Sequence, residues 1–121
     1  MRVLVQRCDK ANVKVDSNIV GSIDKGLMIL VGFTEGDNFD TIKYMVDKIV
    51  NLRVFDDENG IMNKSLLDKS FSILSVSQFT LYADYKHGNR PSYKKALESN
   101  EAKKLYEKFN DEFRKLRVKI E

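Results

Sequence analysis

Hydrophobic and polar residues alternate along the first part of the chain with the two-residue period of β-strands. A turn signal at Ser17-Asn18 separates two of the alternating segments. A later stretch, Leu27 to Val31, is apolar without interruption and is bounded by glycines, which is typical of a strand buried on both faces. The pattern predicts four strands, at residues 2–8, 11–16, 19–23 and 27–31.

Two later segments carry apolar residues at helical spacing. The first runs from Phe39 to Val50, and Asp37 is expected to cap its N-terminus. The second runs from Ala102 to Leu116. Further strands are predicted at residues 52–55 and 73–82 and from residue 118 onward. This order of strands, helix, strands, helix and strand predicts an α/β domain in which two helices cover a mixed sheet.

Three polar residues, Ser77, Gln78 and Thr80, interrupt the apolar run of the strand predicted at residues 73–82. A buried polar group without a partner costs about 1–3 kcal/mol, so the interruption needs a reason. On a continuous strand, Gln78 and Thr80 would share one face at a separation of about 7 Å. An amide and a hydroxyl so placed could hold an ester carbonyl and a sugar hydroxyl. A satisfied polar pair at the rim of a strand explains the pattern equally well.

The composition describes one domain that covers residues 1–121. Hydrophobic residues make up 42% of the chain and charged residues 32%, and no apolar run is long enough to span a bilayer. Cys8 is the single cysteine, which excludes an internal disulfide and favours a reducing cytosol. The formal net charge of +3 permits a nucleic-acid partner but does not argue for one.

The residue inventory offers little conventional catalytic chemistry. One histidine and one cysteine do not make a zinc site, and the acidic run 56–58 ends in Asn-Gly, as solvated turns do. His87 lies in a charged loop, where an exposed histidine is the usual case. The chain therefore lacks an evident general base. If it is an enzyme, its reaction needs little acid–base help, or the substrate supplies that help.

A loop that follows the polar interruption is basic. Lys86, Arg90, Lys94 and Lys95 lie within ten residues that contain no acidic side chain, with tyrosines interleaved. Such a loop suits contacts to phosphates, and it suits a plain solvated surface as well. The composition leaves both interpretations open.

Several motifs along the chain resemble one protein family. They are residues 1–7, 48–55, 62–66, 76–83 and 86–92. In this order and spacing, over the whole chain, they resemble the D-aminoacyl-tRNA deacylases of the bacterial and eukaryotic type. The resemblance implies curved, barrel-like layers of mixed β-sheet packed with two helices. It also implies a cytoplasmic homodimer with its active sites at the subunit interface.

The resemblance further implies an activity. The family hydrolyses the ester that joins a D-amino acid, or mischarged glycine, to the 3′ end of tRNA, and it uses no metal or cofactor. This is a chiral proofreading step in translation. Two rival hypotheses remain open: a dimeric module that binds RNA or the tRNA end without catalysis, and a domain that only dimerises.

The resemblance assigns individual residues as well. Catalysis is expected of Ser77, Gln78, Phe79 and Thr80, and substrate contacts are expected of Arg7, Leu81, Lys86 and Arg90. Backbone N–H groups near Phe79 and Thr80 would stabilise the oxyanion. Thr80 is one candidate nucleophile. The alternative, in which the 2′-hydroxyl of the RNA assists water, suits this chain better because no side chain is expected to deprotonate Thr80.

One family motif has no counterpart in the sequence. The family carries an Asn-x-Gly-Pro-Val-Thr segment near its C-terminus, whose Gly-Pro reaches into the partner's pocket and excludes L-amino acids. Here the single proline is Pro91, and the sequence ends at Glu121. Arg7 matches the residue that braces the Gly-Pro element. We therefore expect a chain that is truncated at its C-terminus.

Overall fold

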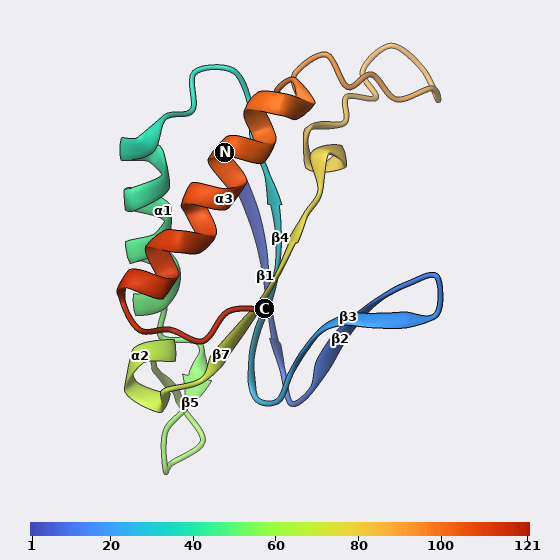
Figure 1. Ribbon diagram of the computed structural model, residues 1–121. Coiled ribbons are helices and arrows are strands. Elements are labelled where there is room, and N and C mark those ends of the chain that lie inside the picture. Colours follow the sequence, from blue (N-terminus) through green and yellow to red (C-terminus); the bar gives the residue numbers. More distant parts are fainter.

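A three-stranded sheet forms the centre of the computed structural model, which describes residues 1–121 (Figure 1). Its strands are β1 (Arg2–Cys8), β4 (Gly26–Gly32) and β7 (Ser72–Ser77), in the order β1-β4-β7. β1 pairs with β4 in antiparallel fashion, and β7 pairs with β4 in parallel. The sheet is therefore mixed, as predicted.

The other elements extend from this sheet. They are the hairpin of β2 (Ala11–Val15) and β3 (Asn18–Ile23), the hairpin of β5 (Phe55–Asp56) and β6 (Met62–Lys64), the helices α1 (Phe39–Asn51), α2 (Leu66–Lys69) and α3 (Ser99–Lys115), and the 3-10 turn η1 (Phe79–Tyr82). The α/β class is confirmed. The strands form separate sheets and do not close into a barrel, and the short helix α2 joins the two helices that were predicted.

The hydrophobic core lies between the sheet and the two long helices, which stand on the same side of the sheet in Figure 1. Leu27, Ile29 and Val31 of β4 point into it and are almost completely buried. Phe109 and Phe113 of α3 are fully buried, and their rings meet edge to face at 4.9 Å. The alternation on β4 and the four-residue spacing on α3 thus bury the same core from two sides.

The N-terminus of α1 differs from the expectation. Asn38 is the N-cap, because its side chain accepts a hydrogen bond from the Thr41 N–H at 3.1 Å. Asp37 instead binds the N-terminal ammonium of Met1 at 2.9 Å. The sequence alone could not reveal this contact, because its two partners are 36 residues apart.

The strand predicted at residues 73–82 was too long. β7 ends at Ser77, and the chain turns into η1 directly after Gln78. The strand predicted at 52–55 was placed too early, because β5 begins only at Phe55 and has two residues. The strand predicted from residue 118 is one parallel bridge between Ile120 and Ile73, next to β7. Strand ends depend on where a neighbour stops pairing, which the hydrophobic pattern does not record.

The second face of the sheet is only partly covered. The β2–β3 hairpin packs over the start of β7, where Leu74 is buried. Beyond it, Leu4, Leu30 and Val76 lie side by side in register across the three strands. Leu4 is 53% exposed, so this row of apolar side chains faces outward. Separately, none of the helices is both long and apolar enough to cross a membrane.

A pair of matched substitutions tests the buried role of β4. Ile29→Val should lower the free energy of unfolding by about 0.5–1.5 kcal/mol, because it removes a methylene from a fully buried side chain. Ile19→Val, on β3 where isoleucine is 58% exposed, should change it little. Urea denaturation measures both values. Equal losses for the two variants would contradict this description of the core.

Candidate active site

A cleft opens where β7 ends. Its volume is about 470 Å³, and it lies between the end of β7, the segment 93–97 and the first two turns of α3. Most of its lining residues are apolar, with Ser77 and Gln78 at the sheet end. A mostly apolar hollow with a few polar groups at one end is the usual form of a small-molecule site.

The three polar residues of the interrupted strand have different surroundings. Ser77 is exposed and Gln78 is half-buried, and both line the cleft. The Gln78 side-chain amide donates a hydrogen bond to the Thr80 hydroxyl, so the two side chains touch and do not stand a strand repeat apart. The satisfied polar pair, one of the two interpretations left open, therefore exists, and the turn of η1 creates it. Thr80 is half-buried and lies beside the cleft, outside its lining.

The backbone of η1 presents free donors at this point. The Gln78 N–H donates to the Val31 carbonyl at 2.7 Å, which continues the pairing of β7 with β4 by one residue. The Phe79 and Thr80 N–H groups come next, and the first N–H groups of a helical turn have no partner within it. Gly32 permits the close packing, since a Cβ there would lie 3.0 Å from the Gln78 carbonyl. Phe79 lines the cleft and Thr80 does not, so the start of η1 borders the cleft.

Arg2 contacts two residues of η1. Its guanidinium donates to the Leu81 carbonyl at 2.7 Å and lies 4.5 Å from the centre of the Tyr82 ring. This residue was missing from the predicted site, because nothing in the sequence connects positions 79 residues apart. Leu81, predicted to contact substrate, does not line the cleft and serves here as the acceptor for Arg2.

Helix α3 forms the opposite wall and is tied to β7 by a polar pair. The Tyr106 hydroxyl donates to the Ser75 carbonyl at 2.8 Å and accepts from the Ser75 hydroxyl at 3.0 Å. Glu98 caps the helix by accepting from the Asn100 and Glu101 N–H groups. The Asn100 bond is the main reason that the pKa of Glu98 is below its ordinary value.

No carboxylate, histidine or cysteine lines the cleft. Its titratable side chains are Tyr93, Lys103 and Tyr106. His87 is exposed in the basic loop, as expected of it. Burial raises the pKa of the Cys8 thiol above its ordinary value, which makes that thiol a poor nucleophile at neutral pH. The chain also has no group of three or more His, Cys, Asp or Glu placed to hold a metal ion.

The basic loop is exposed and stands next to the cleft. Lys86 and Arg90 do not line the cleft, but Tyr93 does, and its ring meets that of Phe79 at 5.1 Å. Asp84 closes the loop: its carboxylate accepts from the Lys86 N–H at 2.9 Å and pairs with Lys95 at 3.7 Å. The bond from Lys86 is the main reason that the pKa of Asp84 is lowered.

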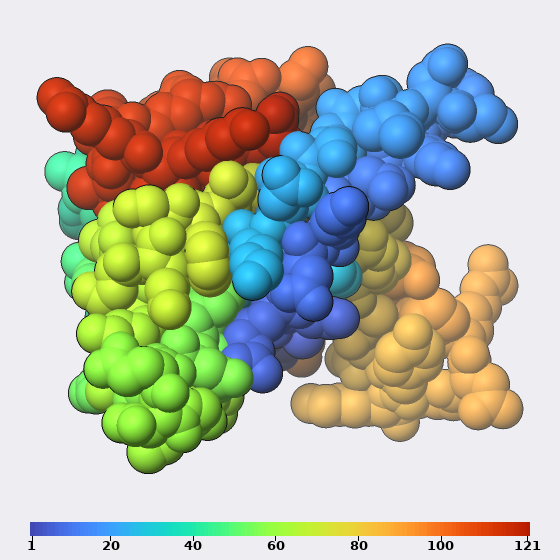
Figure 2. All heavy atoms as spheres, turned by 90° about the horizontal axis from the view of Figure 1, so that it is seen from below, coloured from blue at the N-terminus to red at the C-terminus, as the bar shows by residue number.

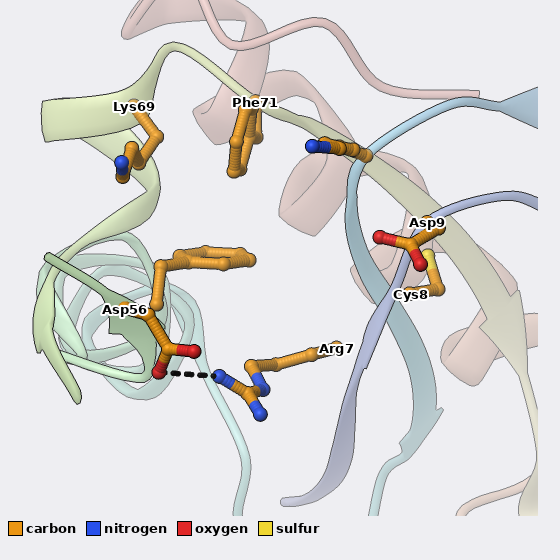
Figure 3. A pocket seen from close by; sticks show the side chains of 8 residues that line it. Arg7, Cys8, Asp9, Asp56, Lys69 and Phe71 are labelled. Atoms are coloured by element: carbon orange, nitrogen blue, oxygen red, sulfur yellow. Dashed lines mark hydrogen bonds and ion pairs between the residues drawn. The ribbon is translucent and has the colours of Figure 1, made fainter. Parts of the chain in front are cut away.

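Arg7 lies at the far end of the sheet. It stands opposite Leu27 and thus Ile73, four residues or about 13 Å along β7 from Ser77. There it pairs with Asp56 at 3.2 Å in a second, polar cleft of about 380 Å³ (Figure 3). Lys69 and Phe71 stand across this cleft. Within one chain, the structure does not bring Arg7 together with the residues at the end of β7.

Comparisons with known proteins agree with the motifs. The family model described as D-Tyr-tRNA(Tyr) deacylase matches residues 4–121. A D-aminoacyl-tRNA deacylase of Fervidobacterium nodosum is 52% identical over the whole chain, which covers 81% of that relative. One of Clostridium perfringens is 50% identical, again over the whole chain and 81% of the relative.

Two solved structures share the fold. One, titled c-Myc DNA Unwinding Element Binding Protein, is 37% identical with a TM-score of 0.92, and the match covers 99% of this chain and 83% of that one. The other, titled as a probable eukaryotic D-amino acid tRNA deacylase, is 20% identical with a TM-score of 0.74 over 88% of this chain and 63% of that one, and it supports the fold alone. From the family model and the identities over its whole length, the chain belongs to the D-Tyr-tRNA(Tyr) deacylase family.

Proposed function

We propose that this chain hydrolyses the ester bond of D-aminoacyl-tRNA, and of glycine mischarged on tRNA, to release the free amino acid and tRNA. The observation that carries the proposal is the pair of free N–H groups, on Phe79 and Thr80, at the edge of a cleft that also presents Gln78. In a member of this family, such donors suit the oxyanion of an ester under attack.

The reaction needs these donors when the oxyanion forms. Water attacks the acyl carbon, the carbonyl oxygen becomes an oxyanion, and the bond from carbon to the ribose oxygen then breaks. The proton lost by water ends on the departing ribose oxygen. The Phe79 and Thr80 N–H groups stabilise the oxyanion, because fixed dipoles at the edge of an apolar cleft need no reorganisation.

The absence of a histidine or carboxylate from the cleft lining favours assistance by the substrate itself. The Thr80 hydroxyl accepts the Gln78 amide hydrogen, and no histidine or carboxylate lines the cleft to remove its proton. The neighbouring 2′-hydroxyl of the terminal ribose can relay the proton of the attacking water. Gln78 and Thr80 then act by position, as a polar pair that fixes the start of η1.

The cleft suits the terminal adenosine of tRNA. Its mostly apolar lining can hold the base, while the ribose and the ester meet Ser77 and Gln78. The basic loop then contacts the phosphates of the tRNA end through Lys86 and Arg90, which are exposed on the loop that leads to Tyr93 of the cleft. Such a reaction belongs in the cytoplasm, where the reduced thiol of Cys8 also fits.

The part of the second sheet face that the β2–β3 hairpin leaves exposed supports a homodimer. Leu4, Leu30 and Val76 form an apolar row on it, and large exposed apolar surfaces mark sites of association. The β2–β3 hairpin and the basic loop extend beyond the body of the molecule on the side away from the helices (Figures 1 and 2). Arg7 lies away from the cleft at the end of β7 in its own chain. It would brace the Gly-Pro element that family members insert into the partner's site.

Hydrolysis of D-tyrosyl-tRNA is the direct test of the proposed activity. D-tyrosyl-tRNA should lose its amino acid faster with the protein than without it. Gln78→Ala should lower the rate by roughly tenfold or more, since it frees the Thr80 hydroxyl and loosens η1. Asn12→Ala, at an exposed amide on β2, is the control. Binding of D-tyrosyl-tRNA without hydrolysis would contradict the proposed activity and favour a non-catalytic binding module.

Arg2 should act on rate through the position of η1. Arg2→Met removes the bond to the Leu81 carbonyl and the contact with Tyr82, and it should lower kcat about tenfold with a smaller change in KM. Arg53→Met is the matched control, since Arg53 also donates to a backbone carbonyl, that of Asn63, but away from the cleft. Both should cost about 0.5–1.5 kcal/mol of stability. Equal kcat values for the two variants would contradict a role of Arg2 in positioning η1.

Sedimentation tests the dimer. The protein should sediment at twice the chain mass of 14.0 kDa. Leu4→Asp should shift it toward the monomer, because it places a charge in the apolar row. Ile61→Asp introduces the same charge at a 62% exposed residue beside β6 and should leave the mass unchanged. A monomer at all concentrations would rule out this use of the sheet face.

A further inference from the structure

Lys103 has a distinctive position in the cleft. Four residues of α3, Ser99, Ala102, Lys103 and Tyr106, follow the spacing i, i+3, i+4, i+7 and line its wall. Lys103 is the one charged side chain among all the residues that line the cleft. Its side chain is exposed and takes part in none of the ion pairs or side-chain hydrogen bonds of the chain. Its ammonium is therefore available to a ligand.

We propose that Lys103 binds the phosphate on the 5′ side of the terminal adenosine. This assignment rests on the proposed function, and it fixes how the substrate lies in the cleft. The 5′-phosphate points toward α3, and the aminoacyl ester points toward Gln78 and the free amides of η1. A lysine on a flexible stem suits a phosphate as a point charge that needs no fixed geometry.

The charges of the substrate support this direction. An aminoacyl-adenosine end carries one positive group, the α-ammonium of the amino acid, and one negative group, the 5′-phosphate. Lys103 attracts the phosphate and repels the ammonium. The reverse placement would bring two cations together, and at low salt their repulsion disfavours it.

The start of α3 does not compete with Lys103 for the anion. A helix N-terminus often binds phosphate, but the Asn100 and Glu101 N–H groups already donate to the Glu98 carboxylate. That carboxylate carries a negative charge at neutral pH, since its pKa is lowered. The positive group left for a phosphate on this wall is thus the Lys103 side chain. From there the RNA can leave the cleft past Tyr93, which belongs to the same segment as Lys94 and Lys95.

Binding of adenosine and of its 5′-monophosphate tests the contact without requiring turnover. Adenosine 5′-monophosphate should bind about three- to fivefold more tightly than adenosine, as measured by calorimetry at low salt. Lys103→Met keeps most of the side-chain length and should remove that preference. Lys104→Met is the matched control, because Lys104 is the adjacent exposed lysine and does not line the cleft. It should keep the preference.

Hydrolysis of small esters gives the second readout. In the wild type, 2′(3′)-O-D-tyrosyl-adenosine with a 5′-phosphate should have a kcat/KM about three- to fivefold above that of the same ester without it. Lys103→Met should lower the first value, mainly through KM, so that the ratio of the two values falls toward one.

Three results would overturn the assignment. They are equal binding of adenosine and its 5′-monophosphate to the wild type, equal loss of the preference in Lys103→Met and Lys104→Met, and binding of neither ligand. Each is distinguishable from failure of the proposed function, because hydrolysis of D-tyrosyl-tRNA by the wild type reports that function separately. If such hydrolysis persists while the preference for phosphate is absent, the enzyme stands and the role of Lys103 does not.

Discussion

The parallel pairing of β7 with β4 fixes the position of the candidate site. The pairing ends where Val31 stands opposite Ser77, and one further bond, from the Gln78 N–H to the Val31 carbonyl, places the next residue. Beyond it the chain must turn, and the first amides of η1 are left without partners. Gly32 at the end of β4 gives the turn the room it needs. The Phe79 and Thr80 N–H groups are therefore free because β7 stops pairing with β4 just before them.

The opposite wall depends on a different kind of constraint. Tyr106 exchanges two hydrogen bonds with Ser75, which holds α3 against β7 two residues before the strand ends. The buried rings of Phe109 and Phe113 continue the same attachment into the core. Because both walls of the cleft are anchored to β7, the cleft keeps its width while its lining stays mostly apolar.

Some of the site could be predicted from local sequence and some could not. Polar residues inside an apolar run drew attention to residues 77–80, since such a run rarely includes them without a purpose, and Ser77 and Gln78 line a cleft. The predicted arrangement of these residues on one continuous strand was wrong, because an apolar pattern does not distinguish a long strand from a strand that ends in a tight turn. Arg2 left no signal at all, as its partners, Leu81 and Tyr82, lie about eighty positions away along the chain.

The sequence by itself determined the α/β class, the two long helices, the buried central strand and the family, because periodicity and ordered motifs are local properties of the chain. Only the tertiary structure decided that the strands do not close into a barrel, that Gln78 meets Thr80 through a turn, and that Arg7 stands away from the cleft. These features depend on pairing between distant segments. Such pairing is set by the packing of the whole chain, which no short stretch of sequence contains.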